Sequence, residues 1–222
     1  MLDSSAGPDP QPMASASPSP PTETNGIQPY RMHVSQRYLE LTKQKLELTR
    51  LPREPKSTHH WDCGVGKTSL EPLLDHWVQS YDWRAQERFF NDTLPQYRIA
   101  IGGTRLHFVH KRSPSRNAIP LLFVHGWPES FISVSSMIHE LCDPVLTPPT
   151  AENESMPAFH LIAPSIPGFG FSDALPEAGN NMRTTADVFV ALMRGLGYNQ
   201  FMVHGSGWYV DRGIDFQMCA VG

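Results

Sequence analysis

Cysteine is scarce in this sequence of 222 residues. It occurs three times, at Cys63, Cys142 and Cys219, and these positions lie far apart. An odd number of widely spaced cysteines argues against a disulfide framework, and no close pair has the spacing of a zinc site. We therefore expect three free thiols, and we expect neither a metal ion nor another cofactor.

An excess of basic residues and a long apolar run are also lacking. Lysine and arginine total 18 against 22 aspartates and glutamates, a net charge of −4, which provides no basic field for a nucleic acid. No stretch approaches the roughly 20 apolar residues of a membrane-spanning helix, and the first four residues do not begin a signal peptide. These features predict a soluble, cytoplasmic protein with no nucleic-acid partner, and 40% hydrophobic residues can form its core.

Residues 1–29 contain no lysine or arginine and almost no large apolar side chains, whereas proline and serine are frequent. Such a segment cannot bury enough apolar surface to offset the conformational entropy that folding removes. We predict a disordered tail over 1–29. A proline-rich ligand for another domain is the alternative.

Residues 30–95 are predicted to be helical. Apolar residues at helical spacing indicate one amphipathic helix over about 35–50, where Ser35 can cap the first turn. A second helix follows Ser69 with Pro72 in its first turn, and a short, charged third helix covers 83–91. We take this region as a unit that precedes an α/β domain.

The segment Gly64-Val65-Gly66-Lys67-Thr68-Ser69 ends like a phosphate-binding loop. The complete pattern would need glycine where Trp61 stands, and a buried strand should precede it. We therefore interpret this segment as a glycine-rich turn into a helix and not as a nucleotide site.

Beyond residue 95 the apolar pattern changes to a period of two. The segments 97–101 and 106–110 flank Gly102-Gly103-Thr104-Arg105, which predicts a β-hairpin. Alternation places His107 and His110 on opposite faces, so they are not expected to share a ligand. Because no further ligands cluster with them, we expect both histidines to be exposed.

Three short apolar runs then predict buried strands, and helical spacing predicts two helices between them. The strands cover 121–124, 159–163 and 200–203; the helices cover 131–141 and about 184–196. Strands that alternate with helices form a mostly parallel sheet through right-handed crossovers. The predicted fold class is therefore α/β, and the turns at Trp127, Phe169 and Gly207 should gather at one edge of the sheet.

The turn His125-Gly126-Trp127-Pro128 follows the strand 121–124. Gly126 allows a close approach of the backbone, and Pro128 fixes φ and has no amide hydrogen, so the turn has a constrained shape. It lies at the carboxyl end of a buried strand, where open α/β folds bind their ligands.

These turns resemble those of the α/β-hydrolase fold, and in detail those of the epoxide hydrolases of the microsomal and juvenile-hormone type. The turn at 125–128 is similar to the family's His-Gly-x-Pro turn, and 163–172 looks like its Pro-Gly-x-Gly-x-Ser segment. Further similar motifs occur in order: Trp61-Asp62-Cys63-Gly64, Trp77, Tyr81-Asp82-Trp83-Arg84 and Phe108-Val109-His110. The resemblance covers 30–208 and implies an N-terminal helical region at 30–95 and an α/β-hydrolase domain at 96–222.

The resemblance implies hydrolysis of a small-molecule epoxide to a vicinal diol through a covalent ester. In the family, a carboxylate on the turn after the third strand opens the epoxide, and a histidine held by an acidic residue then activates water. Tyrosines on a lid assist the ring oxygen. The backbone amides of Trp127 and Trp208 would form the oxyanion hole.

The sequence departs from this pattern at the nucleophile. When Trp208 is matched to the tryptophan of the family's small-x-Asp-Trp-Gly turn, Gly207 stands where the aspartate belongs, and Tyr209 replaces the final small residue. The lid, the acidic partner and the catalytic histidine have no counterpart. We expect a C-terminally truncated hydrolase domain that is inactive as written, and a wrong exon boundary is our hypothesis for its last residues.

Two alternatives stay open. A serine hydrolase would use Ser206, yet this residue is not centred in Gly-x-Ser-x-Gly, and His204 is not placed to activate it without a third group. A noncatalytic binding or regulatory fragment would use the unpaired edge of strand 200–203 and the N-terminal helices to associate with a full-length relative, or the sheet edge to associate with a second copy.

Overall fold

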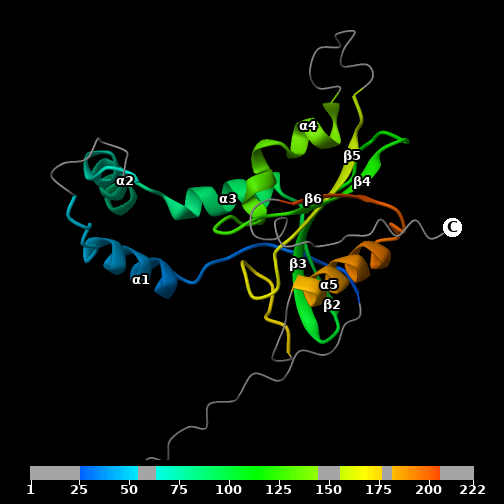
Figure 1. Cartoon of the computed structure of the whole chain (residues 1–222), viewed down its shortest axis with the longest axis horizontal. Coiled ribbons are helices and arrows are strands. Elements are labelled where there is room, and N and C mark those ends of the chain that lie inside the picture. Colours follow the sequence, from blue (N-terminus) through cyan, green and yellow to red (C-terminus); the bar gives the residue numbers. More distant parts are fainter. Residues whose placement is uncertain (1–25, 55–63, 145–155, 177–181, 206–222) are drawn as a thin grey trace, which may run out of the picture.

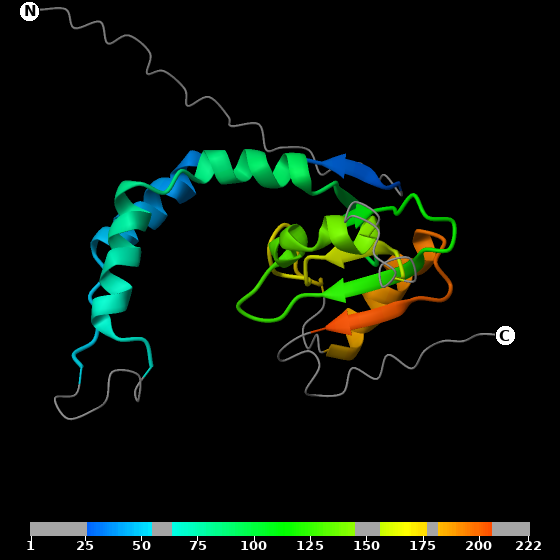
Figure 2. The ribbon, with the colours of Figure 1, turned by 90° about the horizontal axis from the view of Figure 1, so that it is seen from above.

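The computed structural model describes residues 26–54, 64–144, 156–176 and 182–205 (Figure 1). These residues form two regions. The helical arm consists of helices α1 (Gln36–Glu47) and α2 (Lys67–Gln79), and the body is built on a six-stranded sheet. Helix α3 (Trp83–Thr93) lies between the arm and the body (Figure 2).

The helical arm is directed away from the sheet in both views (Figures 1 and 2). Its two helices contact each other, and neither helix, each of which is described over its full length, contains a buried residue. Tyr38, Leu73 and Trp77 are each at least half exposed. The two helices that the amphipathic pattern predicts are present, but many of their apolar side chains are exposed.

The glycine-rich turn before α2 leads directly into the helix. Gly66 is the N-cap residue, so α2 begins earlier than predicted and Pro72 lies inside it and not in its first turn. The carboxylate of Glu54 accepts a hydrogen bond from the amide of Lys67 at the start of the helix. Because this carboxylate occupies the end of the helix that would attract a phosphate, the structure agrees with a turn and not a nucleotide site.

The sheet has the strand order β1-β2-β3-β5-β4-β6. Its strands are β1 (Gln28–Tyr30), β2 (Gln96–Ile101), β3 (Thr104–Lys111), β4 (Ile119–Val124), β5 (Phe159–Pro164) and β6 (Met202–Gly205). Strand β4 pairs in parallel with β5 and β6, and the pairs β1–β2, β2–β3 and β3–β5 are antiparallel. The α/β fold class is confirmed, but the described sheet is mixed because the hairpin and β1 add antiparallel pairs to the parallel strands.

The predicted hairpin joins β2 and β3 through a two-residue turn. Ile101 pairs with Thr104, and Gly102 and Gly103 have positive φ angles of 57° and 80°. Two positive φ angles match the twist of a tight hairpin and favour glycine. Thr104 and Arg105, which were predicted in the turn, are the first residues of β3.

Two strands differ from the prediction. Gln28 and Pro29, which were assigned to the tail, form β1 with Tyr30, whose ring lies 4.1 Å from the guanidinium carbon of Arg98. Strand β6 begins at Met202, so His204 belongs to the strand and not to the turn, where it pairs with Phe123. Both strands are fixed by a neighbour in the sheet, which a local pattern does not reveal.

The segment predicted as one helix over 131–141 is divided. It forms a 3₁₀ helix, η1 (Phe131–Ser136), and a short helix α4 (Ile138–Cys142), with Met137 between them at φ −124°. Helix α5 (Met182–Gly195) is followed by Gly197 with a φ of 89°, which confirms the predicted glycine at its C-terminal end.

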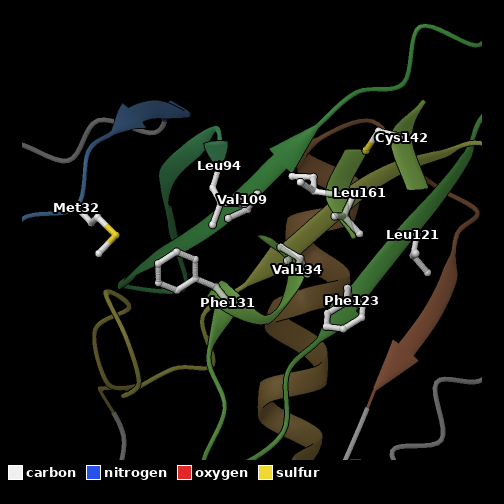
Figure 3. Close-up of a cluster of buried hydrophobic side chains, with 11 residues drawn as sticks. Met32, Leu94, Val109, Leu121, Phe123, Phe131, Val134, Cys142 and Leu161 are labelled. Atoms are coloured by element: carbon white, nitrogen blue, oxygen red, sulfur yellow. The ribbon is translucent and has the colours of Figure 1, made fainter. Parts of the chain in front are cut away.

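Apolar clusters lie on both faces of the sheet. One joins η1 and α4 to the strands through Phe131, Val134 and Leu161, and it also includes Met32 and Leu94 from the N-terminal region (Figure 3). The other lies under α5 and includes Phe108, Phe189 and Leu192. The strands in the middle of the sheet are thus covered on both sides, as the apolar runs at 121–124 and 159–163 predict.

No helix within the described ranges has both the length and the apolar character needed to cross a bilayer. Cys142 is a buried, free thiol. Cys63 and Cys219 lie outside the described residues.

Candidate active site

The candidate site lies where the three parallel strands end. The turn at 125–128 follows β4, the loop 165–173 follows β5, and Gly205 at the end of β6 pairs with Val124 at the end of β4. The structure therefore brings together two of the three predicted turns and the strand that leads to the third. Ser206, Gly207 and Trp208 lie outside the described residues.

His125 is buried at the start of the first turn. Its Nδ1 lies 2.9 Å from the carbonyl oxygen of Gly126, and its Nε2 lies 3.3 Å from the amide nitrogen of Ile166. Because the Ile166 amide can only donate, Nε2 accepts and the proton is on Nδ1. Burial lowers the pKa of His125, although Gly126 and Glu129 act in the opposite direction. The neutral ring thus joins the turn after β4 to the loop after β5.

Trp127 presents its backbone at the strand ends. The bond between Trp127 and Pro128 is cis, and the Trp127 residue is 64% exposed. None of the described residues accepts a hydrogen bond from its amide. An amide that is held in position but has no acceptor is what an oxyanion hole requires.

The loop 165–173 is shaped by two glycines with positive φ angles, Gly168 at 85° and Gly170 at 55°. A Cβ atom at Gly170 would lie 2.7 Å from the Oγ of Ser165. Glycine is therefore required at 170 both for its backbone conformation and for the space beside Ser165. The Pro-Gly-x-Gly-x-Ser pattern is explained by this turn.

His107 corrects the expectation of an exposed strand histidine, because it is fully buried. Its Nδ1 lies 2.8 Å from the Oγ of Ser165, and its Nε2 lies 3.1 Å from the Oε1 of Gln96. The rings of Tyr30, Phe131 and Phe171 surround it with centroid distances of 4.6 to 5.5 Å. Burial, with a smaller effect of Arg98, lowers the pKa of His107 to about 3, so the ring is neutral.

His110 lies on the opposite face of β3, as predicted, but it too is not exposed. Its Nε2 lies 3.1 Å from the hydroxyl of Tyr198, and burial followed by the charges of Arg112 and His160 lowers its pKa to about 4. The sequence contained a signal for this burial, because Phe108 and Val109 show that both faces of β3 are covered. A histidine on either face of this strand is therefore expected to pack against the core.

The pair of His107 and Ser165 has the hydrogen bond of a base and a nucleophile, but its position excludes that role. Ser165 is fully buried, so no substrate reaches its hydroxyl. His204, the other candidate base, is exposed on β6 and stacks on Phe123 at a centroid distance of 4.8 Å. Within the described ranges, no group of three or more histidine, cysteine, aspartate or glutamate side chains is arranged to hold a metal ion.

The arrangement of these turns on a mixed sheet defines the class of α/β-hydrolase-fold proteins. The family described as "Epoxide hydrolase N terminus" matches residues 27–134, and that described as "alpha/beta hydrolase fold" matches residues 119–208. The chain belongs to the epoxide hydrolase family.

Individual relatives agree with this assignment. The chain is 40% identical over 184 residues to a Stigmatella aurantiaca protein named "Putative epoxide hydrolase", over 82% of this chain and 40% of that one. It is 33% identical over 191 residues to "Epoxide hydrolase 1" of Oryctolagus cuniculus, over 84% of this chain and 40% of that one. The crystal structure of juvenile hormone epoxide hydrolase from Bombyx mori matches with a TM-score of 0.69 and 27% identity, over 84% of this chain and 43% of that one. The chain thus spans about 40% of the length of these curated relatives.

Proposed function

We propose that this chain derives from enzymes that convert an epoxide to a vicinal diol through a covalent ester, and that its 222 residues do not complete this reaction. The observation that carries the proposal is the turn at 125–128. Its histidine is fixed against the loop after β5, and its Trp127 amide has no acceptor among the described residues. This geometry supports one half of an oxyanion hole.

The proposed inactivity rests on the sequence that follows β6. The α/β-hydrolase match ends at 208, and alignment of Trp208 with the family's tryptophan leaves Gly207 at the position of the nucleophilic aspartate. Glycine has no side chain to attack an epoxide carbon, so the ester intermediate cannot form at this position. The amide of Trp208 is proposed as the second oxyanion donor.

Diol formation from an alkene or arene epoxide tests the inactivity directly. We expect the purified chain to produce diol no faster than buffer does, measured by chromatography. Diol production that is lost in a His125→Phe variant, which removes the anchor of the turn, would contradict the proposal because it would show turnover at this site.

A Gly207→Asp variant tests the lineage of the site. A carboxylate at 207 can open the ring in one step: a C–O ester bond forms, the ring C–O bond breaks, and the alkoxide takes a proton from solvent. We expect a mass increase equal to that of the epoxide at position 207, located by peptide fragmentation, and no increase there in the unchanged chain. Labelling confined to the cysteines in both proteins would count against an epoxide site.

A noncatalytic binding or regulatory fragment is the second candidate. It is favoured by the exposed side chains of Tyr38, Leu73 and Trp77 on the helical arm. Strand β6 adds an edge, because among the strands that the structure describes it pairs only with β4. Light scattering of the chain alone and mixed with a full-length relative distinguishes the two candidates: a complex of defined mass supports the fragment, and unchanged components exclude it.

A further inference from the structure

The loop 165–173 has no regular secondary structure, yet the hairpin β2–β3 holds it at several points. Arg98 donates from Nη2 to the carbonyl oxygen of Phe171 at 2.8 Å. Arg105 binds the carboxylate of Asp173 through Nε and Nη2 at 2.6 and 3.3 Å. These contacts fix the second half of the loop, and His107 contacts both of its ends.

His107 is hydrogen-bonded to both ends of the loop. Its carbonyl oxygen accepts from the amide of Ser165 at 2.9 Å, and its amide donates to the Oγ of Ser172 at 2.9 Å. The hydroxyl of Ser172 donates in turn to the carbonyl oxygen of Ser165 at 2.8 Å. The backbone of His107 therefore positions the loop, and its ring adds a contact that depends on which nitrogen carries the proton.

The position of that proton is fixed by a chain of hydrogen bonds that begins in the N-terminal segment. The amide of Met32 donates to Oδ1 of Asn91 at 2.8 Å, and Nδ2 of Asn91 donates to the carbonyl oxygen of Met32 at 2.9 Å. Since the backbone groups of Met32 have fixed roles, the side chain of Asn91 can be oriented in one way only.

The orientation of Asn91 fixes that of Gln96, which in turn fixes the position of the proton on the His107 ring. Oδ1 of Asn91 is an acceptor, so the group of Gln96 that faces it at 3.1 Å is the donor Nε2. Gln96 then presents Oε1 to His107, whose Nε2 must carry the proton. The remaining nitrogen, Nδ1, has a free lone pair and accepts from the hydroxyl of Ser165.

Ser165 is followed directly by the residue that anchors the oxyanion turn. The amide of Ile166 donates to Nε2 of His125, so two neutral histidines hold two consecutive residues from opposite sides. A displacement of Ser165 would move the Ile166 amide, and through His125 it would move the turn that contains Trp127.

We infer that His107 is a positioning residue for the oxyanion turn: with its proton held on Nε2 by Gln96, it fixes Ser165 and thereby the contact of Ile166 with His125. The inference rests on the proposed function only for the use of that turn in catalysis. It assigns to the N-terminal segment at Met32 a role in setting the geometry of the strand ends.

Two substitutions at 107 separate the two halves of the ring. Asparagine places its carboxamide near the position of Nδ1, where it can accept from Ser165, whereas glutamine places it near Nε2, where it can reach Gln96. The readout is amide hydrogen exchange at Ile166, compared with the amide of His110 on β3, which donates to the carbonyl oxygen of Pro95 just before β2. The ratio of the two rates removes any change in global stability. His110→Asn is the matched control, because His110 also bonds to a hydroxyl but faces Tyr198.

We expect His107→Gln to raise the exchange rate at Ile166 relative to His110 by about tenfold, and His107→Asn to change it by less than about threefold. In the His110→Asn control, whose own amide is perturbed, the Ile166 rate is compared with the unchanged chain and should also stay within about threefold. Equal exchange at Ile166 in the Gln and Asn variants would overturn the inference.

Imidazole ¹⁵N chemical shifts of the unchanged chain provide a test that needs no variant. We expect the Nε2–H tautomer for His107 and the Nδ1–H tautomer for His125. The Nδ1–H tautomer at His107 would overturn the inference even if every variant failed to fold. Neither measurement uses an epoxide, so the positioning role and the proposed reaction can fail independently.

Discussion

The helical arm and the loop 165–173 are opposites in how they are held. The arm consists of regular helices whose backbone bonds are internal, yet α1 and α2 contain no buried residue. The loop has no helix or strand, yet it is bound by Arg98, Arg105, His107 and His125. Regular secondary structure therefore does not measure how well a segment is placed. Tertiary contacts fix the position of the loop, and the arm has few of them.

Glu87 of α3 contacts the segment that leads from the body into the helical arm. Its carboxylate accepts hydrogen bonds from the amide of Val34 at 2.6 Å, from Arg84 at 2.6 Å and from the indole of Trp83 at 3.3 Å. Burial alone would raise the pKa of Glu87. The hydrogen bonds together lower this pKa by more than burial raises it, so the pKa of Glu87 is below its usual value. In the segment that leads into α1, Val34 is thus held by a buried carboxylate of α3, next to Met32, which is held by Asn91.

The largest expected effect on the body is that of pH. The pKa values of His107 and His110 are lowered to about 3 and about 4, so both are neutral in the folded chain. Between about pH 4 and 6.5 the unfolded chain binds protons that the folded chain does not, and stability rises with pH by up to roughly 1.4 kcal/mol per unit for each histidine. Burial also lowers the pKa values of His125 and His160, which act in the same direction.

Urea unfolding at pH 4.5, 5.5 and 6.5 measures this dependence through near-ultraviolet circular dichroism. Equal stability at the three values would show that these histidines bind protons in the folded chain as readily as in the unfolded chain, so that their pKa values are not lowered. It would also remove the argument that they act as acceptors at the strand ends.

Truncation of one leucine in each region tests the comparison most directly. Leu161 on β5 is fully buried, and Leu73 on α2 is 64% exposed. Leu161→Ala should lower the free energy of unfolding by about 2–5 kcal/mol because it leaves a cavity, while Leu73→Ala should cost less than about 1 kcal/mol. Chemical denaturation of the two variants gives both values. An equal loss would mean that the face of the arm is covered in solution.

Glu87 near the body and Glu71 on the arm provide the next comparison. Glu87→Ala leaves the amide of Val34 and the guanidinium of Arg84 without their acceptor, which should cost about 2–3 kcal/mol. Glu71→Ala removes the exposed pair with Lys67 on the arm and should cost less than about 0.5 kcal/mol. The two variants are compared by thermal unfolding. A loss at Glu87 as small as that at Glu71 would show that the segment at Val34 is held by other contacts.

Two glycines provide the smallest contrast. Gly64 before α2 and Gly170 in the loop both have positive φ angles, 104° and 55°, but only Gly170 is crowded. Gly64→Ala should cost about 1 kcal/mol from backbone strain alone, and Gly170→Ala roughly 1 kcal/mol more because the methyl group meets Ser165. The free energy of unfolding of the two variants is measured by chemical denaturation. An equal loss in both variants would contradict the close approach of residue 170 to Ser165.

The parts of the fold that were predicted are those with a pattern of several residues. Alternation and two glycines indicated the hairpin β2–β3, and apolar runs indicated β4 and β5. The segment β1 has three residues and no alternation, so its strand conformation depends on pairing with β2. The shift of β6 to include His204 depends in the same way on its register with β4. Such pairings join residues that are distant in sequence, which is why local patterns did not reveal them.

The turns that form the candidate site were predicted, but the buried side chains that hold them in place were not. The turn at 125–128 was predicted from the backbone requirements of Gly126 and Pro128, and the glycines at 168 and 170 were identified only through the resemblance of 163–172 to a family motif. The burial of His107 was not, because its partner Gln96 lies on β2 and its partner Ser165 lies in the loop after β5, so neither has a regular sequence spacing from it. Polar side chains of this kind become readable only when the faces of a strand are known to be covered.

The separation between His107 and Ser165 has a consequence for the order of folding. The hairpin closes between Ile101 and Thr104, whereas the His107–Ser165 bond spans 58 residues. Local contacts form with less loss of chain entropy than distant ones, so we expect the hairpin to form early and the strand ends to assemble last. During synthesis, β3 leaves the ribosome well before β5, and in that interval the ring of His107 is exposed to water and free to take up a proton. Arrival of Ser165 would then be coupled to release of that proton, which makes the rate of the final folding step dependent on pH.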